Sequence, residues 1–136
     1  MLSRELYRTT PERVRQALAD WRSDAPLERL LEVDARWRQA QAEMEGLKAE
    51  RNRGSKEIGQ LFASGRRDEA EAAKGRMTAL GVRIAELEAE ATRLAGEMTE
   101  LELVIPYLPH ASVRVGPDET ANRLERSWGD PPRFAF

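Results

Sequence analysis

A cluster of basic residues lies in the middle of the chain, between two acidic flanks. Residues 48–76 hold 8 basic and 5 acidic side chains, a net charge of +3, whereas residues 1–47 carry −1 and residues 77–136 carry −4. The basic residues are Lys48, Arg51, Arg53, Lys56, Arg66, Arg67, Lys74 and Arg76. Ammonium and guanidinium groups gathered in this way attract phosphate, so the region is a candidate for binding a polyanion. The charge count alone leaves open the alternative that the run only keeps a turn hydrated.

Groups that catalyse reactions or hold metals are scarce. The chain has one histidine, His110, and no cysteine, which excludes paired-imidazole sites, thiolate sites and disulfides. It contains neither a glycine-rich phosphate loop nor a nucleophile elbow. The glutamates at positions 86–102 are interpreted as the exposed face of a helix: Glu86, Glu88, Glu90, Glu97, Glu100 and Glu102. We therefore expect no catalytic residue, no metal and no cofactor.

Cysteine usage and hydropathy bear on where the protein works. The absence of cysteine is typical of a reducing compartment. No apolar run approaches the ~20 residues that a membrane span requires, and the N-terminus lacks the apolar core of a signal peptide. We expect a soluble, cytoplasmic protein without a membrane partner.

Two stretches with a heptad repeat must position the basic cluster. In the second stretch the apolar rows are Met77, Ile84, Ala91, Met98, Ile105 and Ala73, Leu80, Leu87, Leu94, Leu101, Leu108. In the first they are Leu30, Trp37, Met44, Ile58 and Val33, Ala40, Leu47, Leu61. Rows that alternate by three and four residues form one seam along a helix, and a partner helix buries that seam. Because only a short break at residues 63–66 separates the stretches, we expect an antiparallel hairpin about 50 Å long.

The expected fold is mainly α, and a long antiparallel two-helix coiled-coil hairpin over residues 26–105 dominates it. The arms are predicted to run from about Pro26 to Phe62 and from about Asp68 to Val104, with the tip at about 60–68. Thr10 followed by Pro11 is typical of a helix start, so residues 1–25 are predicted to hold one short helix ahead of the hairpin.

The last part of the chain differs in composition. Residues 106–136 are a Pro-rich linker without helical periodicity. Val113 and Val115 flank Arg114 in the alternation of a short strand, which predicts a small extended or β tail. A segment of this size does not bury a core by itself. It must pack on the hairpin root, pair with a second copy of the chain, or belong to a domain that is absent, and these alternatives stay open.

Two residues interrupt the apolar seam near the tip. Arg51 and Gly54 occupy positions where apolar side chains are expected, and a glycine inside a helix costs roughly 1 kcal/mol. One explanation is ordinary fraying near a helix end. The other is that the tip is kept polar and adjustable for contact with a ligand, and the sequence favours this one slightly.

Four motifs occur in a recognisable order along the whole chain. They are Met1-Leu2 with Pro11-Glu12; Glu50-Arg51-Asn52 with Ser55-Lys56-Glu57-Ile58-Gly59; Ile105-Pro106-Tyr107-Leu108-Pro109-His110-Ala111-Ser112-Val113; and Gly116-Pro117-Asp118-Glu119 with Trp128-Gly129 and Phe134-Ala135-Phe136. This order resembles the N-terminal part of bacterial-type seryl-tRNA synthetase. Two positions depart from the family pattern, because Tyr107 stands where Asn is usual and Arg114 where Pro is usual.

The resemblance implies a non-catalytic arm that holds serine tRNA, chiefly by its long variable arm, through shape and phosphate contacts. The residues predicted to bind the nucleic acid are Arg51, Asn52, Arg53, Ser55, Lys56, Lys74 and Arg76. Arg51 has two interpretations, since its side chain either turns inward toward Glu71 or a backbone carbonyl, or reaches outward to RNA. ATP and Mg²⁺ would belong to the family's catalytic domain, none of which is in this sequence, so we expect no ligase activity.

Two other functions compete with this interpretation. In one, the chain is a stand-alone paralogue of the arm that binds a protein or DNA partner, which the altered linker residues Tyr107 and Arg114 favour. In the other, the chain is a structural coiled coil without a ligand, which the basic tip argues against.

Overall fold

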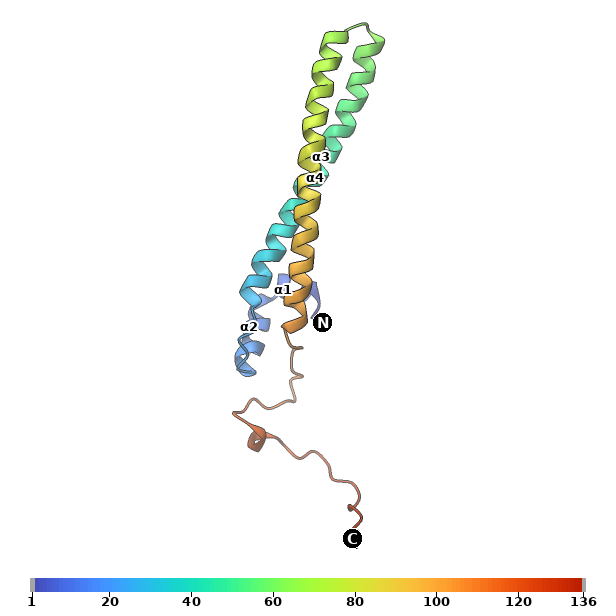
Figure 1. Ribbon diagram of the computed structural model, residues 1–136. Helices are drawn as coiled ribbons and strands as arrows, with labels where there is room; N and C mark the ends of the chain where they lie inside the picture. The colour runs from blue at the N-terminus through green and yellow to red at the C-terminus, as the bar shows by residue number, and fades with distance from the viewer. Residues whose placement is uncertain (1, 136) are drawn as a thin grey trace.

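A long helical hairpin dominates the computed structural model of the protein (Figure 1). The structure describes residues 2–135. Its helices are α1 (Arg4–Thr9), α2 (Pro11–Asp20), α3 (Leu27–Ala63) and α4 (Arg67–Val104), followed by a single 3₁₀ turn, η1 (Glu119–Ala121). α3 and α4 pack antiparallel along their length, while α1 and α2 lie at the root, where the chain begins (Figure 1). The predicted hairpin and both of its arms are confirmed to within a residue or two at each end.

Gly65 makes the turn at the tip. Its φ of +76° lies in the left-handed region, which glycine adopts without strain. The Gly65 amide donates to the Phe62 carbonyl oxygen over 3.1 Å, and the Arg66 amide donates to the Leu61 carbonyl oxygen over 2.9 Å. These two bonds form a Schellman motif, which satisfies the last carbonyls of α3 and sends the chain directly into α4.

The apolar core is thick at the root and thin at the tip. The root cluster consists of Leu2, Tyr7, Val14, Leu18, Leu27, Leu30, Val33, Leu94, Met98 and Ile105, with Trp37 packed against it. The tip cluster contains only Leu61, Ala70 and Ala73, with Ile58 beside it. α1 and α2 cover the seam at the root, so four helices share that core, whereas only α3 and α4 build the tip.

Two buried carboxylates tie α1 to both arms at the root. Glu102 of α4 accepts hydrogen bonds from Arg4 Nε over 2.7 Å and from the Tyr7 hydroxyl over 2.7 Å. Asp34 of α3 accepts hydrogen bonds from Arg8 Nε over 3.0 Å and from Arg38 Nε over 3.0 Å. Arg4 and Arg8 are one helical turn apart, so a single face of α1 reaches both arms.

The interpretation of Glu102 as a solvent-exposed residue was therefore wrong, because its side chain is buried at 1% exposure. Position 102 flanks the seam rather than lying in it, and α1 is the element that covers it. Glu86, Glu88 and Glu100 are exposed on α4 as expected, while Glu90 and Glu97 are partly buried beside arginines of α3.

The start of the chain forms two short helices where one was predicted. Thr10 lies between them, and its hydroxyl donates to the Leu6 carbonyl oxygen at the end of α1 instead of capping α2. Pro11 does begin α2, as expected of proline at a first helical position. Met1 lies outside the described residues.

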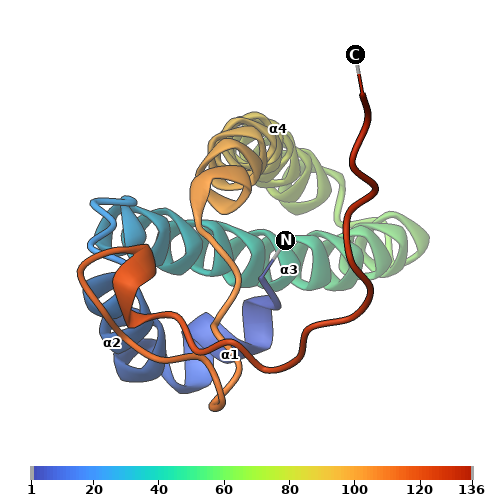
Figure 2. The ribbon, with the colours of Figure 1, turned by 90° about the horizontal axis from the view of Figure 1, so that it is seen from below.

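The predicted β tail is wrong, because no strand forms anywhere in residues 2–135. Val113 and Val115 are exposed, and a strand needs a neighbouring strand to take up its backbone hydrogen bonds. Seen from below, the tail runs across the root end of the hairpin (Figure 2). There it borders a groove of about 400 Å³ that Trp21 and Arg22 line from the α2 side.

The tryptophans were interpreted as core or root-packing residues, which is wrong for two of the three, since Trp21 is 54% exposed and Trp128 is 94% exposed. Phe136, the last residue of an expected extended segment, lies outside the described part of the chain. Within that part, no helix is long and apolar enough to cross a membrane.

Candidate nucleic-acid interface at the hairpin tip

The hairpin brings the predicted binding residues together at its far end. Five of them, Arg51, Asn52, Arg53, Ser55 and Lys56, lie on the last third of α3, and all five are exposed. Lys74 and Arg76 lie on the first third of α4 and are also exposed. The antiparallel register places these two groups on opposite arms of the same tip, so one ligand can reach both (Figure 1).

The register is fixed by packing between the arms. A Cβ on Gly54 would come within 2.4 Å of Met77 Sδ, so the missing side chain of the glycine gives room to the methionine. The seam is therefore filled at this point by a side chain from the opposite arm. Gly54 has a packing role here, which sequence reasoning did not identify.

Arg51 lies in a seam position but its side chain is exposed. It forms no salt bridge to Glu71 or to any other residue among 2–135, so the inward interpretation is not what the structure shows. Its charge acts on Glu88, whose pKa is lowered by a hydrogen bond from Lys48 and by the charges of Lys48 and Arg51. A long side chain at a seam position reaches solvent in this way while its carbon stem covers apolar surface.

Five cations of the tip have no carboxylate partner within salt-bridge distance among the described residues: Arg51, Arg53, Lys56, Arg67 and Arg76. The other three are paired. Lys48 contacts Glu88 over 2.7 Å, Lys74 contacts Glu71 over 3.7 Å, and Arg66 contacts Glu69. Glu50, Glu57 and Asp68 are likewise exposed without an ion-pair partner among the described residues, so the tip presents a net excess of positive charge to solvent.

The polar residues of the predicted site have different roles. The Ser55 hydroxyl donates to the Arg51 carbonyl oxygen over 2.9 Å, so its proton is used within α3 and its oxygen remains as an acceptor. Asn52 is exposed on the neighbouring turn and keeps both an amide donor and a carbonyl acceptor.

Sequence reasoning left out two residues of this surface. Arg67, the first residue of α4, is exposed and forms no salt bridge within the described residues, and Phe62 is 44% exposed near the end of α3. Both flank the seam in the heptad register, and that register was the signal that could have identified them.

The tip offers a surface rather than an enclosed site. Four grooves among the described residues lie along the stem and at the root, away from residues 51–76. No group of three or more potential metal ligands occurs within residues 2–135. An exposed, convex, positively charged end suits contact with an extended polyanion, whereas a small molecule needs a concave site.

Comparison with known proteins identifies the family. The sequence profile described as seryl-tRNA synthetase N-terminal domain matches residues 1–109. The chain belongs to this family. Over its full 136 residues it is 46% identical to the serine–tRNA ligase of Thermomicrobium roseum and 41% identical to that of Symbiobacterium thermophilum. It spans 30% and 32% of the lengths of these two relatives.

A solved structure supports the same assignment. The chain superposes on the seryl-tRNA synthetase of Pyrococcus horikoshii, which was solved in complex with ATP, with a TM-score of 0.77 and 29% sequence identity. The match covers 88% of this chain and 27% of that protein. The seryl-tRNA synthetase N-terminal domain accounts for the long hairpin and for the order of the motifs in the sequence.

Proposed function

We propose that this seryl-tRNA synthetase N-terminal domain is a non-catalytic arm that binds serine tRNA by its long variable arm. The tip contacts phosphates and ribose hydroxyls of a helical RNA stem. The root holds the two arms of the hairpin together, and the arms hold the tip at a fixed distance from the root. The observation that carries the proposal is the group of five tip cations that lack a carboxylate partner among the described residues.

The contrast with the stem of the hairpin supports this role. Arginines along the stem are paired across the two arms: Arg29 with Glu97, Arg36 with Glu90, and Arg83 with Glu43. Their charge is neutralised locally, so it adds little attraction for a polyanion. Five exposed cations without such partners raise the affinity for phosphate, because their binding to RNA releases counterions and this release favours the complex.

The shape of the arm supports recognition of a duplex. α4 alone has 38 residues and is about 57 Å long at ~1.5 Å per residue. The wide minor groove of A-form RNA presents phosphates and 2′-hydroxyls that a narrow helical rod contacts without reading bases. Phe62 is the one large aromatic side chain exposed at the described tip, so extensive stacking on unpaired bases is not favoured.

Filter binding with two tRNAs tests the proposal. Serine tRNA is compared with a tRNA that has a short variable arm, both titrated with this chain over a range of salt concentrations. If three to five phosphates are contacted, log K falls with log salt with a slope of roughly −2 to −5. The expected result is weaker binding of the tRNA with the short variable arm.

Duplex DNA of similar length serves as the competitor in the same assay. Equal affinity for both tRNAs, or equal competition by DNA, contradicts recognition of the variable arm. The absence of binding at low salt contradicts the role of the tip altogether.

A further inference from the structure

The two helices of the tip form a ribbon with two edges, and the ion pairs between the arms identify them. The Lys48 edge is the side on which Lys48 contacts Glu88. The Arg83 edge is the side on which Arg83 contacts Glu43; toward the root, Arg36 and Glu90 pair on this same edge. In an antiparallel coiled coil the residues that flank the seam meet along one edge or the other, never across both.

Heptad positions assign each charged tip residue to an edge. Within residues 48–76 the Lys48 edge holds four cations and one carboxylate: Lys48, Arg51, Arg67, Lys74 and Glu71. The Arg83 edge holds three of each: Arg53, Arg66, Arg76, Glu50, Glu57 and Glu69. Lys56 and Asp68 face away from the seam, and their opposite charges cancel in the count. The net charge of +3 of residues 48–76 therefore lies on the Lys48 edge. Glu88, which lies outside this range, pairs with Lys48, and the edge still carries a net charge of +2 when Glu88 is counted.

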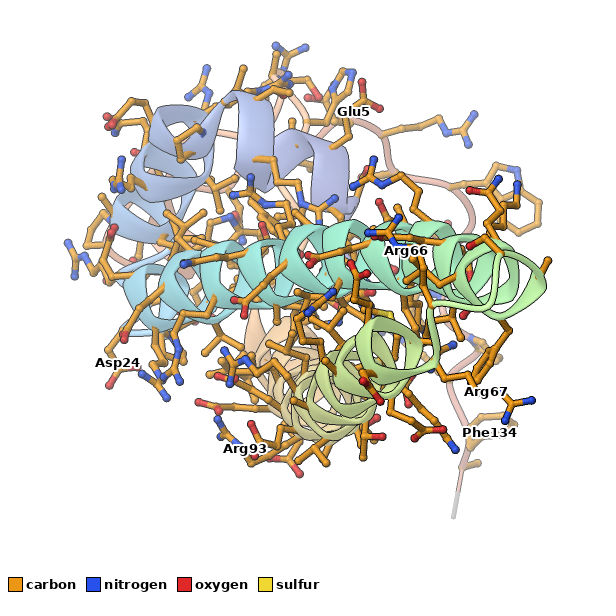
Figure 3. All side chains as sticks on the ribbon, turned by 90° about the horizontal axis from the view of Figure 1, so that it is seen from above. Glu5, Asp24, Arg66, Arg67, Arg93 and Phe134 are labelled. Atoms are coloured by element: carbon orange, nitrogen blue, oxygen red, sulfur yellow. The ribbon has the colours of Figure 1, made fainter. Side chains whose placement is uncertain are left out.

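Electrostatic contacts agree with this assignment. Arg51 lowers the pKa of Glu88, the carboxylate that defines the Lys48 edge, after the larger effects of Lys48. Arg66 pairs with Glu69 and also feels the charge of Glu57, both on the Arg83 edge. Figure 3 looks down on the tip and shows the labelled Arg66 and Arg67 side chains extending toward different sides.

The register continues differently along the two edges. One heptad beyond the Arg83–Glu43 pair, Arg76 stands opposite Glu50. One heptad beyond the Lys48–Glu88 pair, Ser55 stands opposite Gly81, and one heptad further Phe62 stands opposite Lys74. The small residues Ser55 and Gly81 therefore allow a ligand to approach the Lys48 edge closely, and the half-exposed ring of Phe62 stands at the end of this edge.

We propose that RNA lies along the Lys48 edge of the tip, where the direct phosphate contacts are made, that the cations of the Arg83 edge add only long-range attraction, and that the Phe62 ring stacks on a nucleotide there. The inference rests on the proposed function and divides its predicted residues into three groups. Arg51, Asn52, Ser55 and Lys74 touch the RNA. Arg53 and Arg76 lie on the edge whose charge is locally balanced, and Lys56 faces away from the seam.

Two matched double variants test the choice of edge. Arg51→Ala with Lys74→Ala removes two positive charges from the Lys48 edge, and Arg53→Ala with Arg76→Ala removes two from the Arg83 edge. All four positions are exposed and helical, where alanine is the best helix former, so melting followed by circular dichroism should show both proteins folded. The readouts are the Kd for serine tRNA and its salt slope.

The Lys48-edge variant should bind about 10-fold or more weakly, with a salt slope reduced by roughly 2, because each phosphate contact contributes about 1. The Arg83-edge variant should lose less affinity, by no more than about 3-fold, because its cations attract the RNA only at long range. Equal losses in both variants, or a larger loss on the Arg83 edge, overturn the inference but leave the proposed function standing. If the unaltered chain does not bind tRNA, the proposed function itself fails.

A third variant tests the aromatic contact. Phe62→Leu keeps an apolar side chain but removes the ring, so affinity should fall about 5-fold or more while the salt slope stays unchanged. An unchanged affinity overturns the stacking role of Phe62. Val82→Ala, an exposed apolar position on the outer face of α4, is the control and should bind like the unaltered chain.

Discussion

The root and the tip of the hairpin are built from the same two helices but use charge in opposite ways. At the root, Arg4 and Arg8 bind the buried carboxylates Glu102 and Asp34. At the tip, cations such as Arg53 and Lys56 are exposed and have no carboxylate partner among the described residues. The difference separates two tasks. Buried, hydrogen-bonded pairs fix how the short helices dock on the arms, whereas unpaired charges keep their attraction for a ligand.

The comparison predicts that the largest effect on stability comes from the root. Glu102→Ala should lower the free energy of unfolding by about 3 kcal/mol, because it leaves the buried Tyr7 hydroxyl and the half-buried Arg4 without their acceptor. Urea denaturation followed by circular dichroism measures this change. Glu100→Ala, at an exposed position on the same helix, is the matched control and should change the value by no more than about 0.5 kcal/mol.

Asp34 makes the root sensitive to acid. Burial alone would raise the pKa of Asp34, but hydrogen bonds from Arg8 and Arg38 outweigh it and hold the pKa below its ordinary value. The stabilisation is therefore complete above the unfolded pKa of about 4 and is lost as the pH falls through the folded pKa. Asp34→Asn should lower the free energy of unfolding by about 2 kcal/mol at pH 7, and this difference from the unaltered protein should shrink below about pH 4.

Thermal melts of both proteins between pH 2 and pH 8 measure this deficit. A deficit that stays constant over the acid range would show that Asp34 acts through packing alone, and the contrast between a charge-fixed root and a free tip would weaken.

Smaller effects are expected at the tip, where few apolar contacts are at stake. Gly65→Ala places a side chain at a φ of +76° and should cost about 1 kcal/mol. Gly59→Ala should stabilise the protein by up to about 1 kcal/mol, because this exposed helical position has no neighbour within 4 Å of an added Cβ. Opposite signs for the two glycines, measured by thermal unfolding, would confirm that the turn requires glycine at position 65 and that position 59 does not.

Much of this architecture was predictable because the apolar spacing is nearly uninterrupted. Rows such as Ile84 and Ala91 require a partner helix, and the short break at 63–66 leaves only the antiparallel arrangement. The burial of Glu102 was not predictable from α4 alone, since it depends on α1 packing across the root. The alternation of Val113 and Val115 favoured a strand, but the described chain supplies no neighbouring strand to pair with it.

The candidate site was predictable in part. Charge counting located the tip, and the resemblance to the seryl-tRNA synthetase arm selected residues within it. Neither showed that Arg66 is paired with Glu69 while Arg67 is not, because ion pairing depends on side-chain direction around the turn. The packing of Met77 against Gly54 likewise needs the register between the arms, which the sequence of one arm does not contain.

The most direct test of the account compares two triple variants of equal charge by the salt dependence of serine tRNA binding. Arg51, Lys56 and Arg67 are changed to Gln at the tip in one protein, and Arg36, Arg83 and Arg93 are changed to Gln along the stem in the other. The account predicts that the tip variant loses roughly two from the salt slope, through Arg51 and Arg67, while the stem variant keeps the slope and affinity of the unaltered chain. An equal loss in both proteins would contradict it, because overall charge rather than unpaired charge at the tip would then govern binding.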